Sequence, residues 1–596
     1  MSACVCCLHV VQRRKNATMN ILIEKNVMVP MRDGVRLATD VYRPAEGGAV
    51  PVLLSRLPYN KDQPVLMQAV IDASRAVQAG YAVVLQDCRG RFASEGEFTP
   101  IVNEANDGVD TVAWIARQHW STGQIGTVGG SYLGFTQWLL AREQPEALRA
   151  MAPAITTSDY YQAPWRHTGG VFELGMSLHW SLGMVPEELQ RRIRQGKASR
   201  EQMSALMQMM GNVYAQFEHL PLVDMPLLRD FAPSYFEWLA HPTYDDYWRG
   251  MAHKEHYEQI TVPALHIGGW YDIFLGGTLE NYTGMKQRGG SALARQHQRL
   301  LIGPWSHGIM TGVFPERTYG LIASADAADL VGVQLRWNDH WLKGEDNGVE
   351  QDKPVKIFVM GRDQWREEDD WPLPDTQFRS YYLHSSGHAN TSAGDGMLST
   401  EVPAEEAEDI YLYDPRRPVP TVGGAVLLSL GLDQGPRDQR SVEAREDVLC
   451  YSTPVLEEPV EVTGPIELVL SVSSSARDTD FTGKLVDVSP DGRAEILTDG
   501  ILRARYRESF TEPKLLEPGQ IYELHLNLWA TSNLFKAGHR IRLEVSSSNF
   551  PRFDRNSNTG GTIETETEQD FVQAVNRVYH ESTHPSYLIL PMIERN

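Results

Sequence analysis

The sequence predicts an α/β domain with a mostly parallel, doubly wound sheet, an inserted helical segment and a C-terminal all-β domain. Three observations lead to this class. Short apolar runs alternate with helical stretches up to about residue 155, and the same alternation returns after residue 256. Between these regions the strand signals stop, and beyond about residue 370 β-rich runs recur without long amphipathic helices.

The first α/β segment opens with a hairpin at residues 26–42, because Asp33-Gly34 is a turn signal between two alternating runs. Residues 51–54 and 81–85 are continuous apolar runs of the kind that a sheet buried on both faces requires. Gly80 closes a helical stretch at 65–79 between them. Spacings of 3, 1 and 3 from Val109 to Ala116 indicate another helix. The segment ends with a strand at 125–128 and a helix that runs through Leu140.

The later segments continue this pattern after the insertion. Within the insertion, residues 187–194 and 200–217 are predicted helices. Strands at 264–268 and 299–302 then flank a helix at 279–286, and a long helix at 325–342 follows with Ser324 as its N-cap. In the all-β region the predicted strands include 466–472, 522–528 and 541–545. The expected division is a disordered tail at 1–18, α/β segments at 19–158 and 257–370, a helical cap at 159–256 and a β domain at 371–596.

Composition excludes several classes of protein. The chain has 596 residues and a formal charge of −22, and no Lys/Arg stripe offsets the repulsion of phosphate, so we expect no nucleic-acid partner. No apolar run reaches the ~18 residues that a membrane helix needs. Five cysteines are too few for a disulfide framework, which favours a reducing compartment and thus the cytoplasm. Cys4, Cys6 and Cys7 lack partners at zinc-finger spacing.

Ser131 occupies a sharp predicted turn between a strand and a helix. Gly129 precedes it by two positions and Gly134 follows by three, as the close backbone approach at a nucleophile elbow requires. Leu133 stands where the strict G-x-S-x-G pattern has glycine, so a purely structural turn stays open at this point.

Two further residues complete a possible triad. Asp272 follows one predicted strand in Gly-Gly-Trp-Tyr-Asp, and His307 follows the next in Gly-Pro-Trp-Ser-His. Serine needs a base and an orienting acid to act as a nucleophile. The chain order Ser, Asp, His at carboxyl ends of strands in one sheet predicts that these three side chains meet.

Acyl transfer also needs donors that stabilise the developing oxyanion. The backbone N–H of Tyr132, directly after the serine, fits the first donor position. The strand at 51–54 leads into Arg-Leu-Pro-Tyr-Asn, which places the Tyr59 hydroxyl where a second donor is expected. A packing role for Tyr59 remains the alternative.

Several segments together resemble the family of bacterial cocaine esterases, X-Pro dipeptidyl peptidases and α-amino acid ester hydrolases. They are the Asp-Gly turn region, Pro-Tyr59-Asn-Lys, Gly-Gly-Ser131-Tyr-Leu-Gly, Gly-Trp-Tyr-Asp272, Gly-Pro-Trp-Ser-His307, Asp-Thr-Asp-Phe-Thr at 478–482 and Ser-Ser-Asn-Phe-Pro at 547–551. The resemblance implies an α/β-hydrolase domain, a helical cap and a C-terminal jelly-roll β-sandwich. It also implies an elbow with glycine three positions after the serine, and an oxyanion hole formed by the Tyr59 hydroxyl and the Tyr132 N–H.

The resemblance also suggests a substrate. Amino-ester hydrolases of the family carry acidic residues after the catalytic aspartate, whereas Asp272 is followed here by Ile, Phe and Leu. Matching positions imply an aromatic acyl pocket able to hold a benzoyl group. Its residues are Trp165, Trp180, Phe274, Leu427 and Leu428.

The resulting hypothesis is a cocaine-esterase-like serine carboxylesterase that hydrolyses neutral esters through an acyl-enzyme. We expect no cofactor and no metal, a small-molecule ester as the partner, and a possible homodimer. The alternatives are an X-Pro dipeptidyl peptidase or amide acylase and, in another class, a carbohydrate-binding protein with an inactive hydrolase domain.

Overall fold

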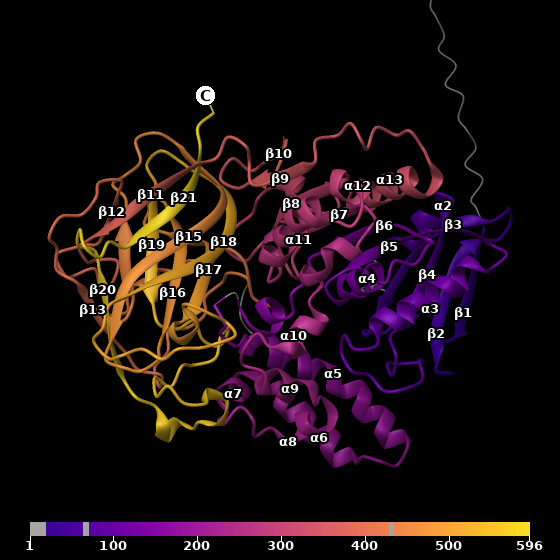
Figure 1. Ribbon diagram of the computed structural model, residues 1–596, viewed down its shortest axis with the longest axis horizontal. Helices are drawn as coiled ribbons and strands as arrows, with labels where there is room; N and C mark the ends of the chain where they lie inside the picture. The colour runs from indigo at the N-terminus through magenta and orange to yellow at the C-terminus, as the bar shows by residue number, and fades with distance from the viewer. Residues whose placement is uncertain (1–19, 64–70, 168, 428–433, 596) are drawn as a thin grey trace, which may run out of the picture.

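The computed structural model describes residues 20–595 except 64–70, 168 and 428–433. It contains a ten-stranded sheet and an eleven-stranded sheet. In Figure 1 the C-terminal β domain, in orange and yellow, lies beside the α/β domain, and the helices α5–α10 cluster along one side of both. The predicted fold class is confirmed. The predicted tail and the Cys4, Cys6 and Cys7 cluster lie outside the described residues.

The ten-stranded sheet is mostly parallel, as predicted. Its strands are β1 (Ile21–Pro30), β2 (Arg36–Pro44), β3 (Val50–Leu57), β4 (Ala82–Asp87), β5 (Ser121–Gly130), β6 (Leu148–Ala154), β7 (Ala264–Tyr271), β8 (Gln298–Ser306), β9 (Val355–Val359) and β10 (Gln364–Glu368). The spatial order is β1-β2-β4-β3-β5-β6-β7-β8-β9-β10. Strands β4 to β9 pair in parallel, and antiparallel pairs occur only at the β1-β2-β4 and β9-β10 ends.

Helices cover both faces of this sheet. They are α2 (Ala73–Gln78), α3 (Glu104–Ala116), α4 (Tyr132–Arg142), α11 (Leu275–Arg288), α12 (Ala292–Gln296) and α13 (Leu330–Lys343). Neighbouring residues of β3 show the alternation: Leu53 belongs to the apolar core with Trp337 of α13, whereas Leu54 belongs to the core with Ile115 of α3. The carboxyl ends of the parallel strands thus lie between two helical layers.

Three local predictions need correction or qualification. Strand β6 was not predicted, because its Ala-rich sequence with Pro153 carries little β-propensity. The helix expected to begin at residue 325 begins at Leu330, capped by Asp329, which accepts from the Gly332 N–H at 3.1 Å. Ser324 caps only a turn, accepting from the Ala327 N–H. Of the helix predicted at 65–79, α2 is the part confirmed, and residues 64–70 lie outside the description.

The insertion is helical. Its helices are α5 (Leu174–Arg194), α6 (Arg200–Gly211), α7 (Val213–Glu218), α8 (Pro226–Phe231), α9 (Ser234–Ala240) and α10 (Asp246–Met251). The single helix expected at 200–217 is broken at Asn212, whose side chain accepts from the Ala215 N–H and so begins a new helix. Helix α5 is the longest of the group and carries Trp180.

The C-terminal domain is built from strands. They are β11 (Gln377–His384), β12 (Met397–Ser399), β13 (Asp409–Tyr413), β14 (Leu449–Ser452), β15 (Val460–Ser474), β16 (Asp480–Val488), β17 (Ala494–Arg503), β18 (Tyr522–Phe535), β19 (Arg540–Ser546), β20 (Ala574–Tyr579) and β21 (Tyr587–Ile593), accompanied by the short α-helix α14 (Arg440–Glu443). Strand β15 pairs with β18, β20 and β21, all antiparallel, which makes it the centre of the domain.

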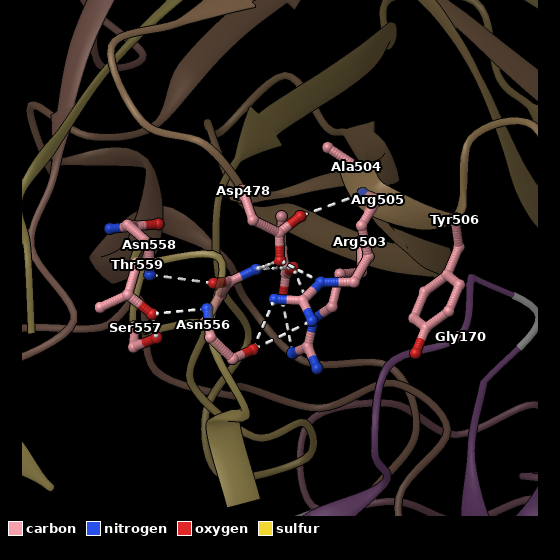
Figure 2. Close-up of polar contacts among 12 residues, drawn as sticks. Gly170, Asp478, Arg503, Ala504, Arg505, Tyr506, Asn556, Ser557, Asn558 and Thr559 are labelled. Carbon is pink, nitrogen blue, oxygen red and sulfur yellow. Dashed lines mark hydrogen bonds and ion pairs between the residues drawn. The ribbon is translucent and has the colours of Figure 1, made fainter. Parts of the chain in front are cut away.

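A buried ionic cluster in the β domain faces the insertion. Arg503 donates to Asp480 at 2.9 Å and to Asp554 at 2.6 Å, and Figure 2 shows Arg503 and Arg505 beside Asp478 and Asn556. The backbone of the same segment binds the insertion, because the Arg503 N–H donates to the Gly169 carbonyl at 3.1 Å. The cluster therefore fixes the surface on which the chain leading into α5 rests.

Candidate active site

Ser131 holds an unusual backbone conformation at the turn from β5 into α4. Its φ of 57° and ψ of −127° lie in a region that non-glycine residues rarely adopt. The Ser131 N–H donates to the carbonyls of Ala154 (3.0 Å) and Ile155 (3.1 Å), so the end of β6 holds the turn in place. This is the strained elbow that the sequence motif predicts.

The two glycines around the serine are needed for space. A Cβ on Gly129, whose φ is +132°, would lie 2.7 Å from the Leu133 Cβ. A Cβ on Gly134 would lie 2.5 Å from the Thr156 side chain. The close approach of α4 to Thr156 therefore falls three residues after Ser131. At the second position Leu133 is buried in the apolar core, so a side chain is accommodated there.

His307 connects Ser131 to Asp272. Its Nε2 lies 3.0 Å from the Ser131 Oγ, and its Nδ1 lies 2.8 Å from the Asp272 Oδ2. Asp272 is fully buried, and its Oδ1 accepts from the Phe274 N–H at 2.8 Å. The carboxylate is thus held against the imidazole, and the second ring nitrogen faces the hydroxyl. The structure brings together all three residues that the sequence places at strand ends.

Tyr132 is the first residue of α4, so its backbone N–H has no acceptor within the helix. Its side chain is anchored in a buried polar network. The hydroxyl accepts from the Ile101 N–H at 2.8 Å and donates to the Glu104 carboxylate at 3.1 Å. Arg56 forms an ion pair with Glu104 at 3.0 Å. The network fixes the start of the helix whose first N–H lies beside Ser131.

Tyr59 lies close to Ser131 and to the insertion. The indole N–H of Trp180 donates to the Tyr59 hydroxyl oxygen at 3.0 Å. Burial raises the pKa of Tyr59 to about 12, although the hydrogen bond that its oxygen accepts from Trp180 opposes the rise. Tyr59 therefore stays protonated at neutral pH and can donate a hydrogen bond.

A cavity of about 1550 Å³ opens over these groups. Its lining includes Ser131, His307, Tyr59, Trp180 and Leu427. Of the other residues of the predicted acyl pocket, Trp165 and Phe274 do not line this cavity, and Leu428 lies outside the described residues.

Trp165 and Phe274 lie behind the residues that face the cavity. The Trp165 ring stacks on Trp238 with centroids 3.6 Å apart and contacts Trp180 edge-on at 5.3 Å. The Phe274 ring is fully buried and lies 5.3 Å from the His307 ring. They support Trp180 and His307 rather than form part of the cavity wall.

Sequence reasoning missed contacts that come from distant parts of the chain. Gln434, in the β domain, accepts from the Ser306 hydroxyl (2.5 Å) and the Gly308 N–H (3.2 Å), on either side of His307. Arg91 donates to the Pro58 carbonyl, next to Tyr59. No motif marks these residues, because each acts through a partner far away in sequence.

Other kinds of site find no support in the described part of the chain. There, no group of three or more His, Cys, Asp or Glu side chains could hold a metal ion. Among the same residues, no helix has the length and hydropathy needed to cross a bilayer.

Two family models match this chain. The model of the X-Pro dipeptidyl-peptidase (S15 family) covers residues 33–309, and the model of the X-Pro dipeptidyl-peptidase C-terminal non-catalytic domain covers residues 347–589. The chain belongs to the X-Pro dipeptidyl-peptidase S15 family. It is a serine hydrolase of this family, and the resemblance found in its motifs is confirmed.

Individual relatives match over nearly the whole length. The chain is 45% identical to a cocaine esterase of Rhodococcus sp. (strain MB1 Bresler), over 97% of this chain and 99% of the relative. A solved aminopeptidase of a marine-sediment Thaumarchaeota archaeon is 25% identical with a TM-score of 0.80, and the match covers 100% and 99% of the two chains. A solved α-amino acid ester hydrolase is 24% identical with a TM-score of 0.79, covering 97% and 98%, and shows the shared fold.

Proposed function

We propose that this protein is a carboxylesterase that hydrolyses neutral esters with an aromatic acyl group through an acyl-enzyme on Ser131. The observation that carries the proposal is the position of His307, within hydrogen-bond distance of both the Ser131 hydroxyl and the Asp272 carboxylate. Serine becomes a nucleophile only with such a base and orienting acid. The similarity to a cocaine esterase at 45% identity supports an ester as substrate.

In the first half-reaction, the Ser131 Oγ attacks the ester carbonyl carbon while His307 accepts the hydroxyl proton at Nε2. Asp272 accepts a hydrogen bond from Nδ1–H and stabilises the imidazolium. The carbonyl oxygen becomes an oxyanion that the Tyr132 N–H and the Tyr59 hydroxyl stabilise. The tetrahedral intermediate then collapses, and His307 returns the proton to the departing alcohol.

The second half-reaction repeats these steps with water as the nucleophile. His307 takes a proton from the water as its oxygen attacks the acyl carbon, and the same two donors stabilise the oxyanion. When the C–O bond to Ser131 breaks, His307 returns the proton to the serine oxygen. The products are the carboxylic acid and the free serine.

The aromatic acyl group is inferred from the surroundings of the nucleophile. Trp180 lines the cavity beside Tyr59, and its ring lies parallel to that of Tyr132 at 6.2 Å. Ile273 and Phe274, directly after Asp272, are buried apolar residues behind the cavity wall, so these positions supply no carboxylate. An aromatic ring gains from contact with Trp180, whereas an ammonium group would lose its hydration without a partner carboxylate at these positions.

Labelling with a fluorophosphonate tests the nucleophile. We expect covalent modification of Ser131 in the wild-type chain and none in Ser131→Ala. Hydrolysis is then measured on phenyl benzoate and phenyl acetate, which share one leaving group. A higher kcat/KM for the benzoate supports the proposed specificity. A serine that does not label, in a chain that folds normally, would refute the enzyme mechanism.

An amide-cleaving activity is the alternative that the family name and the archaeal aminopeptidase suggest. Two anilides distinguish it from ester hydrolysis. Benzanilide has the acyl group of phenyl benzoate with a different leaving group, and an X-Pro anilide has the acyl group that a dipeptidyl peptidase requires; both are compared with phenyl benzoate. Preference for the X-Pro anilide would replace the esterase proposal by a peptidase.

A further inference from the structure

The hydrogen bond between Trp180 and Tyr59 has a fixed direction. An indole nitrogen can only donate, so the Tyr59 oxygen is the acceptor at 3.0 Å. A tyrosine hydroxyl has a single hydrogen, and this bond does not use it. The hydrogen is therefore available to the other neighbour of the Tyr59 oxygen, the Ser131 side chain.

We propose that Trp180 is a positioning residue that holds and polarises the Tyr59 hydroxyl as an oxyanion donor. This inference rests on the proposed function, because it assigns how one of the two donors is oriented. The indole bond favours the arrangement in which the Tyr59 hydrogen is directed at the reacting centre. It also acts on the acidity of the phenol, since a donor to the oxygen lowers the pKa of Tyr59 against the effect of burial.

The indole is held in place by aromatic contacts. Trp180 is 9% exposed, and its ring is parallel to that of Tyr132 at 6.2 Å with an interplanar angle of 10°. Trp165 contacts it edge-on at 5.3 Å. A side chain fixed between these rings donates along one direction, so the bond to Tyr59 does not depend on bound substrate.

A second contact connects the same two elements. Arg91, which is 3% exposed, donates to the Pro58 carbonyl at 3.0 Å and to the Met184 carbonyl at 3.2 Å. Pro58 precedes Tyr59, and Met184 lies one helical turn after Trp180 on α5. The loop that carries Tyr59 and the helix that carries Trp180 are thus joined at two points. These two contacts fix the position of the Trp180 indole relative to the Tyr59 phenol.

The bond from Trp180 to Tyr59 is expected to affect the transition state rather than the binding of substrate. Negative charge on the substrate oxygen develops as Ser131 attacks, and a more acidic phenol donates to it more strongly. Removal of the indole N–H therefore lowers kcat, whereas ground-state binding of a small acyl group changes little. A Trp180 that serves only as pocket wall gives the opposite result, with a higher KM for aromatic acyl groups and an unchanged kcat.

A double-mutant cycle with Tyr59→Phe tests the inference on phenyl acetate and phenyl benzoate. We expect Trp180→Phe to lower kcat about 3- to 10-fold on both esters, the range that a single neutral hydrogen bond allows. In the Tyr59→Phe background the same change lowers kcat by less than about 2-fold, because the acceptor is already gone. Trp180→3-benzothienylalanine keeps the shape of the indole without its N–H and gives the same factors.

Trp165→Phe is the matched control. Its indole nitrogen has no hydrogen-bond partner among the described residues, and it packs against the same Trp180 ring. Because Trp165→Phe keeps an aromatic ring against Trp180, the bond from Trp180 to Tyr59 is retained, and any loss of kcat is the same factor in both backgrounds. Equal factors for Trp180→Phe in the two backgrounds, or an effect on KM for phenyl benzoate alone, would overturn the inference and leave the esterase intact. An unchanged kcat in Tyr59→Phe itself would instead refute the proposed oxyanion hole, and with it this inference.

Discussion

At the scale of single residues, different atoms of Ser131 determine the strain in its backbone and its proposed reactivity. The positive φ of 57° is unfavourable for any residue with a side chain, and it is maintained by two hydrogen bonds from the Ser131 N–H to the end of β6. The hydroxyl contributes its bond to His307. The strain comes from the Cβ, whereas the proposed nucleophilic attack comes from the Oγ.

Two substitutions at this position therefore have different effects. Ser131→Ala keeps the Cβ and removes the proposed nucleophile, so we expect ester hydrolysis to fall by about 10³-fold or more with little change in stability. Ser131→Gly also relieves the strain, and its free energy of unfolding should exceed that of Ser131→Ala by about 1 kcal/mol after the entropy cost of glycine. Denaturant unfolding of both variants measures this difference. A glycine variant less stable than the alanine variant contradicts the strain argument.

Tyr59→Phe tests the hydroxyl donor with almost no change in volume. Because the hydroxyl acts on charge that develops in the transition state, kcat should fall by about 10²–10³-fold while substrate binding changes little. A tyrosine that only packs would show its loss in the melting temperature instead. Steady-state kinetics and thermal unfolding of this variant decide between the two, and a kcat near wild type argues against the donor.

The sequence identifies some site residues better than others, for a physical reason. Ser131, Asp272 and His307 each follow a strand of one sheet, and strand ends can be recognised from local pattern. Glu104 and Gln434 reach the site only because the chain folds. Gln434 contacts the loop that carries His307 although it lies 127 positions further along the chain (434 − 307). Local patterns contain no information about such contacts.

At the scale of elements, the packing of α4 against the end of β6 determines where the serine lies. Thr156 donates from its hydroxyl to the Ser131 carbonyl at 3.0 Å, and its side chain fills the space opposite Gly134. Helix α4, the serine turn and the end of β6 are thus packed closely together at Gly134. The position of this glycine follows from the contact between two elements rather than from the turn alone.

Gly134→Ala is therefore expected to destabilise the protein, although alanine has a higher helix propensity than glycine. The added Cβ meets Thr156 at 2.5 Å, and displacement of Thr156 costs about 1–3 kcal/mol and disturbs the serine turn, so activity falls as well. Gly183→Ala in α5 is the matched control, since nothing lies within 4 Å of the place that its Cβ would take, and it should gain about 0.5–1 kcal/mol. Denaturant unfolding compares the two, and equal stabilisation would contradict the packing argument.

Elements were predicted where the hydrophobic pattern decides them, and their boundaries were missed where side-chain hydrogen bonds decide them. Strands β3 and β4 follow from continuous apolar runs. Asn212 divides a predicted helix by capping a new one, and Asp329 rather than Ser324 begins α13. Several polar residues in each region could cap, and the choice among them depends on the tertiary fold.

At the scale of the whole molecule, buried charges hold the insertion against the β domain. Arg166 of the insertion forms an ion pair with Glu564 at 3.1 Å, and Glu173, which precedes α5, lies 3.7 Å from Arg552. These contacts position the helix that carries Trp180. Two expectations stay predictions. They are the domain boundaries at 158, 256 and 370 and the homodimer.

The buried Glu173 carboxyl makes the free energy of unfolding of the protein depend on pH. Burial raises the pKa of Glu173 from 4.5 to about 7, although Arg552 opposes the rise. A raised carboxyl pKa contributes stability that is fully present below the unfolded value and is lost as pH rises through the folded value. Between pH 5 and pH 8 this group alone should remove about 2 kcal/mol from the free energy of unfolding.

Glu173→Gln removes this titration and leaves Arg552 its ion pair with Asp499. On going from pH 5 to pH 8, the stability of the variant relative to wild type should therefore increase by about 2 kcal/mol. Denaturant unfolding of both proteins at several pH values measures the difference, in which the titration of every other group cancels. Glu46→Gln, at an exposed site after β2, removes the same charge and controls for the change in net charge. Parallel stability curves for Glu173→Gln and wild type would show that this carboxyl titrates as it does in the unfolded chain, and that its burial between the insertion and the β domain carries no electrostatic cost.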